Sequence, residues 1–152
     1  MKTTVSKSKN KTRPIGRILR LLLGIFFVTE VVPVYQEVTL LGTFIRIGWA
    51  LALIVFYILL HFIVVKYFPK VNKVAGAILA FGPFLAVFFI GYGGPAATGA
   101  LTFLAASLIA AAVRGDTGCE VMSLPAIVLG KHTHLACILF SPIDLIEKGL
   151  KK

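Results

Sequence analysis

The sequence contains little charge. Charged residues make up 14% of the 152 residues and hydrophobic residues 58%, whereas soluble proteins average about 25% and about 45–50%. The stretch from Val74 to Val113 has no Asp, Glu, Lys, Arg or His at all. A small soluble domain leaves much of its area exposed, so it could not hide this much apolar surface. The composition therefore excludes an ordinary soluble domain and predicts an integral membrane protein.

Complete catalytic motifs are also absent from the sequence. It has no nucleophile elbow, H-E-x-x-H, P-loop or Rossmann glycine pattern. Four acidic residues could supply a catalytic pair, but each fits a turn or a helix end equally well: Asp116, Glu120, Asp144 and Glu147. The sequence therefore favours a protein that is not an enzyme.

Acidic residues are missing from the first twenty positions, which hold seven of the sixteen basic ones. No stacking aromatics interrupt this run and a span follows it at once, which argues against nucleic acid as a partner. We expect residues 1–14 to be disordered and attracted to anionic lipid head groups. Lys rather than Arg dominates the segment, which argues against a mitochondrial presequence. We expect a bacterial or archaeal cytoplasmic membrane, with an organelle membrane as the alternative.

Four apolar runs have the length of membrane spans. A hydrocarbon core of about 30 Å needs roughly 20 helical residues, and backbone polar groups inside it must be satisfied within the segment. The sequence thus predicts an all-α protein whose residues 15–113 form four transmembrane helices, at about 15–35, 47–65, 74–92 and 96–113. The turn Gly91–Pro95 joins the last two helices.

Basic residues predict the orientation of these spans. Lys66, Lys70 and Lys73 lie between the second and third spans, on the same side as the basic N-terminus, and only Arg46 lies on the opposite side. The positive-inside rule then places both termini in the cytoplasm. Residues 114–152 would form a cytoplasmic, membrane-associated tail.

The tail contains two apolar runs that are too short to cross a bilayer, Val121–Leu129 and Leu135–Phe140. They could form a small β-hairpin or a re-entrant or interfacial pair of segments, and periodicity does not decide between these. Ser141 and Pro142 fit the start of a final amphipathic helix that lies along the inner leaflet.

Two cysteines and two histidines in the tail could bind a metal. Thiolate and imidazole ligands suit tetrahedral zinc and would also suit copper. The spacing C-x12-H-x-H-x2-C lacks the paired C-x2-C of a zinc finger, so inert thiols with surface histidines or a disulfide between the two cysteines are alternatives. The four candidate ligands are Cys119, His132, His134 and Cys137.

Glu30 is an acid within the first span, and His61 is the only histidine in any predicted span. A carboxylate inside a membrane is costly and by default faces the bundle interior or a wet cavity, where it marks a proton or cation pathway. Glu30 and His61 are therefore candidate pathway residues. In the alternative interpretation Glu30 lies higher, at the outer interface, and pairs with Arg46.

Small residues recur at i, i+4 in the fourth span, a spacing that allows helices to approach closely. Three function classes follow from these observations. The first is a non-catalytic accessory or assembly subunit that packs through this small-residue face against other membrane subunits or itself. The second is a small oligomeric transporter using Glu30 and His61. The third is a metal-handling or thiol-redox protein using the tail.

Overall fold

The computed structural model describes residues 14–67, 73–114, 121, 123–128 and 143, and the regular structure of these residues is entirely helical. This confirms the all-α prediction for the described part of the chain, which contains no strand. The helices, in chain order, are α1 (Pro14–Gln36), α2 (Leu40–Tyr67), α3 (Lys73–Ile90), α4 (Pro95–Arg114) and the short α5 (Ser123–Val128).

Three helices of the described residues are long and apolar enough to cross a membrane: Pro14–Gln36, Leu40–Leu60 and Pro95–Arg114. They support an integral membrane protein. Helix α3 has 18 residues and is about 27 Å long at 1.5 Å per residue. The fourth span and the orientation of the helices remain predictions.

Local capping residues explain where the helices begin. Pro14 and Pro95 each occupy a first helical position, where the missing N–H loses no helical bond. Thr39 caps α2, because its Oγ1 accepts a hydrogen bond from the Gly42 N–H at 3.3 Å. Helix α2 therefore begins at Leu40, seven residues before the expected boundary at 47, and Arg46 lies within the helix rather than in a loop.

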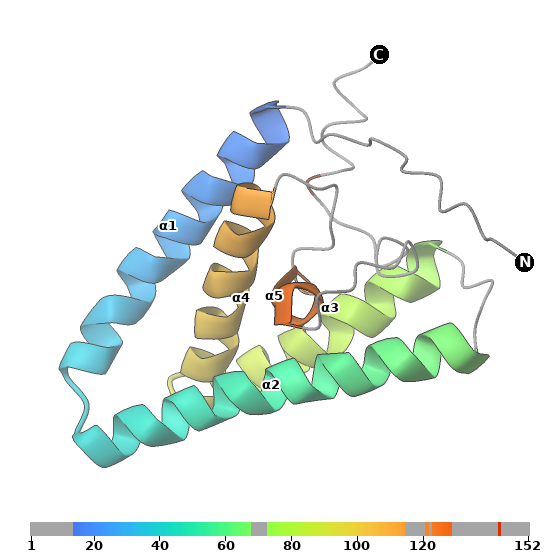
Figure 1. Cartoon of the computed structure of the whole chain (residues 1–152). Helices are drawn as coiled ribbons and strands as arrows, with labels where there is room; N and C mark the ends of the chain where they lie inside the picture. The colour runs from blue at the N-terminus through green and yellow to red at the C-terminus, as the bar shows by residue number, and fades with distance from the viewer. Residues whose placement is uncertain (1–13, 68–72, 115–120, 122, 129–142, 144–152) are drawn as a thin grey trace, which may run out of the picture.

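Helix α4 occupies the centre of the molecule and packs against α1, α2, α3 and α5. In Figure 1, α1 and α4 lie side by side in opposite directions, so the start of α1 is near the end of α4. Helix α2 diverges from α1 after the turn that joins them and crosses the start of α4. Its 28 residues measure about 42 Å, and a helix longer than the bilayer core can tilt to fit.

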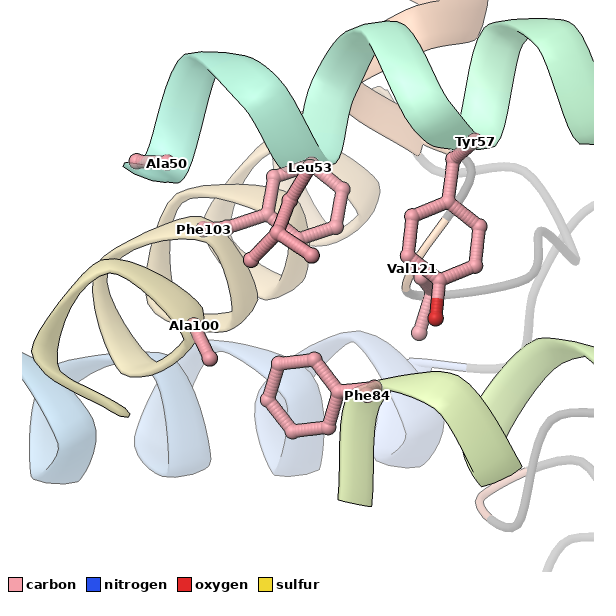
Figure 2. Close-up of a cluster of buried hydrophobic side chains, with 7 residues drawn as sticks. All are labelled: Ala50, Leu53, Tyr57, Phe84, Ala100, Phe103 and Val121. Carbon is pink, nitrogen blue, oxygen red and sulfur yellow. The ribbon is translucent and has the colours of Figure 1, made fainter. Parts of the chain in front are cut away.

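The core is a cluster of side chains between α2, α3 and α4 (Figure 2). The rings of Tyr57 on α2 and Phe103 on α4 stack with centroids 5.6 Å apart, and both side chains are buried. Such close packing matters in lipid because van der Waals contact, not exclusion of water, holds helices together there. The cluster consists of Ala50, Leu53, Tyr57, Phe84, Ala100, Phe103 and Val121.

The start of the tail returns into this helical bundle. Val121 is fully buried in the core cluster, and α5 packs against α4 and α2. The Ser123 hydroxyl donates a hydrogen bond to the carbonyl of Ser107, seven residues before the end of α4. The β-hairpin alternative is therefore wrong for residues 123–128, which form a helix. The second apolar run and residues 144–152 of the final helix lie outside the described residues.

Candidate functional site

One face of α1 packs closely on α4. Its buried residues, Gly16, Arg20, Gly24 and Val31, recur at helical spacing and include two glycines. A Cβ atom on Gly24 would lie 2.7 Å from Cγ1 of Ile109, so the glycine permits the close approach of the two helices. This contact determines which face of α1 points away from the bundle.

Two arginines mark the end of the molecule where α1 begins, here called the Arg17 end. Arg17 donates from Nε to the Ala112 carbonyl at 3.0 Å and from Nη2 to the Val113 carbonyl at 3.3 Å. These carbonyls lie in the last turn of α4, where helical donors run out and a cation is favourable. Arg20 is fully buried. It lies on the face of α1 that packs on α4.

A polar network joins three helices at the opposite end of α4, here called the Arg46 end. Arg46 of α2 donates from Nη1 to the Gly94 carbonyl at 3.3 Å and to Thr98 Oγ1. Thr102 donates from Oγ1 to the Thr98 carbonyl at 2.7 Å, and its Oγ1 lies 3.0 Å from the hydroxyl of Tyr35 on α1. The network therefore ties α1 and α2 to the first two turns of α4.

Gly99 allows α2 to reach this network. A Cβ atom at this position would lie 2.5 Å from Cβ of Trp49 and 2.9 Å from the Arg46 carbonyl oxygen. Backbone atoms of α2 cannot move aside as the end of a flexible side chain can. Gly99 thus marks the point where α2 crosses α4.

Glu30 lies off the buried face of α1, and its side chain is exposed. It therefore does not face the bundle interior. The alternative partner, Arg46, is instead bonded to Gly94 and Thr98. Glu30 is thus an acidic residue of an apolar helix, and its side chain faces away from the described bundle.

His61 lies in α2, but its side chain is outside the described part of the structure. A proton or cation pathway through Glu30 and His61 remains a prediction.

The four predicted metal ligands, Cys119, His132, His134 and Cys137, lie outside the described residues. Among the residues that are described, no group of three or more His, Cys, Asp or Glu side chains could hold a metal ion. A zinc or copper site in the tail therefore remains a prediction.

The small residues of α4 that recur at i, i+4 differ in their exposure. Ala100 is buried, Ala96 and Ala110 are half-buried, and Ala106 is exposed. The part of this face that α1, α2 and α5 cover cannot also receive a partner helix. Packing of a partner against the remaining part of this face stays a prediction.

Sequence reasoning did not find the polar network around Arg46. The available signal was Thr98 and Thr102, two hydroxyl residues at i, i+4 in the apolar helix α4. Polar side chains inside a span often bond to neighbouring helices, so this pair could have suggested an interhelical contact.

Comparisons with protein-family models, curated proteins and solved structures gave no match.

Proposed function

We propose that this protein is a non-catalytic accessory or assembly subunit of a membrane complex. One observation carries the proposal. Arg17 and Tyr35 of α1 form hydrogen bonds with α4, whereas the Glu30 side chain of the same helix is exposed among apolar residues. A carboxylate at such a position in a span is expensive unless another protein or a wet cavity receives it. A neighbouring subunit would supply the contact that the described residues do not make.

The distribution of buried surface supports the same function. In the apolar windows of the three long helices, 56% of α4 is buried but only 17% of α1 and 17% of α2. Helix α4 thus holds the bundle together, and α1 and α2 present broad apolar surfaces to lipid or to other membrane subunits. In this proposal the partners are such subunits or further copies of the chain.

The proposal includes a location and an orientation. The protein crosses a bacterial or archaeal cytoplasmic membrane four times, with α3 as the third span and both termini in the cytoplasm. The basic residues 1–13, together with Arg17, then face anionic lipid head groups, which attract each cation by about 1 kcal/mol.

Purification from native membranes tests the function. A tagged full-length chain, extracted in gentle detergent, should elute as a complex with a membrane protein in fixed stoichiometry. Cross-linking in intact membranes before extraction should capture the same pair. A monodisperse single chain in both experiments would contradict the proposal.

A further inference from the structure

One exposed face of α1 carries Glu30. Leu23, Phe26, Glu30 and Pro33 are separated by three, four and three residues, and all four side chains are exposed. Residues at this 3-4 spacing form one stripe along a helix, as in the seam of a coiled coil. We call this stripe the Glu30 face. Helix α1, which carries this face, lies at one edge of the molecule in Figure 1.

The Glu30 face offers two hydrogen-bond acceptors inside an apolar helix. One is the Glu30 carboxylate. The other is the carbonyl of Thr29, because Pro33 lies inside α1 and has no N–H to donate to it. The Thr29 hydroxyl donates its own hydrogen to the Phe26 carbonyl at 2.7 Å. Adjacent residues therefore present groups that can accept a hydrogen bond from a partner.

The Arg46 end of the bundle does not neutralise Glu30. Arg46 lies at this end of the described residues, and it donates to Gly94 and Thr98 of α4. Glu30 lies six residues before the end of α1, a distance of about 9 Å along the axis. A carboxylate inside a span is costly unless a charged or hydrogen-bonding partner or a wet cavity receives it, and among the described residues Arg46 does not.

We propose that the Glu30 face docks a transmembrane helix of a partner protein that carries Lys or Arg at the depth of Glu30. This inference rests on the proposed function and names the chemistry of the partner. An ammonium or guanidinium group supplies both the positive charge and several donors, which fits a carboxylate beside an open carbonyl. A symmetric contact between two copies would instead place Glu30 opposite Glu30, where like charges repel.

A synthetic helix tests this recognition directly. The probe is a fluorescent poly-leucine transmembrane peptide with one Lys placed at the depth of Glu30, and the control is the same peptide without Lys. Energy transfer to the labelled full-length protein in liposomes should show association with the Lys peptide. Glu30→Gln should weaken this association about tenfold, in line with polar contacts between transmembrane helices. Equal binding of both peptides to the native chain would overturn the inference.

Three variants separate the chemistry from a general effect on folding. Glu37→Gln is the matched control, because Glu37 is also exposed but lies beyond the end of α1; it should bind the Lys peptide normally. Pro33→Ala restores an N–H near the Thr29 carbonyl and should weaken binding about threefold. Glu30→Lys should lose the Lys peptide and bind a peptide with Glu at the same depth. Failure of this exchange would contradict a charge-paired contact.

The native complex distinguishes this inference from the function on which it rests. If Glu30→Gln loses the complex and Glu37→Gln retains it, the result supports both the accessory function and the docking surface. A complex that survives Glu30→Gln intact leaves the accessory function standing and overturns the docking surface. The native chain could instead self-associate in liposomes, and Glu30→Gln could abolish this self-association. That result would identify a second copy of the chain as the occupant of the Glu30 face and overturn the proposed partner.

Discussion

Single glycines decide how closely the helices of this protein approach. Gly99→Ala should lower the free energy of unfolding by about 1–3 kcal/mol, because the added methyl meets Trp49 and the α2 backbone. Gly48→Ala is the matched control, since a Cβ there meets nothing within 4 Å and alanine favours helix. Unfolding in mixed detergents measures both variants. Equal stabilities would show that α2 does not cross at Gly99.

The bond between Tyr35 and Thr102 is the other residue-scale feature that can be tested alone, since it links α1 to α4 at 3.0 Å. A double-mutant cycle with Tyr35→Phe and Thr102→Val should give a coupling of about 0.6 kcal/mol and at most about 1.7 kcal/mol. Unfolding free energies of the native chain, both single variants and the double variant provide the value. Strictly additive effects would argue against the bond.

At the scale of elements, the sequence predicted the helices better than their contacts. Long charge-free runs identify helices because lipid leaves the backbone no other way to satisfy its polar groups. They do not identify faces, since a helix that is apolar all round has no amphipathic pattern. The sequence alone therefore does not show that Arg20 lies on the buried face of α1 and Glu30 on an exposed one. The Cys/His tail set lies outside the described residues, and its role remains a prediction.

Helix α5 is the element whose position departs most from a tail lying on the membrane surface. In a Cys119→Ser, Cys137→Ser background, Val121→Cys should react with maleimide at least about tenfold more slowly than Val128→Cys. The reason is exposure: Val121 is fully buried, whereas Val128 is 66% exposed. Denaturation should equalise the two rates, which controls for intrinsic reactivity. Similar rates in the folded protein would show that residue 121 is not packed in the core.

At the scale of the whole molecule, α4 is the hub of the bundle. It packs against α1, α2, α3 and α5, and more than half of its apolar window is buried. The sequence suggested α4 as the surface for partners because of its small residues. In the structure α1, α2, α3 and α5 all pack on α4, so the larger exposed apolar surfaces belong to α1 and α2. This is why the proposed docking surface lies on α1.

The number of spans determines on which side of the membrane the tail lies. With α3 as a span, Thr39→Cys and Tyr92→Cys, both exposed beside helix ends, lie outside and Ser8→Cys lies inside. In the same cysteine-free background, an impermeant thiol reagent should label the first two in intact cells and Ser8→Cys only after permeabilisation. If α3 does not cross the membrane, Tyr92→Cys lies inside, as Ser8→Cys does. The reason is that one crossing fewer places every later segment on the opposite side of the membrane. Labelling of Tyr92→Cys only after permeabilisation would thus establish three spans and move the Cys/His tail outside, where a disulfide between Cys119 and Cys137 would be stable.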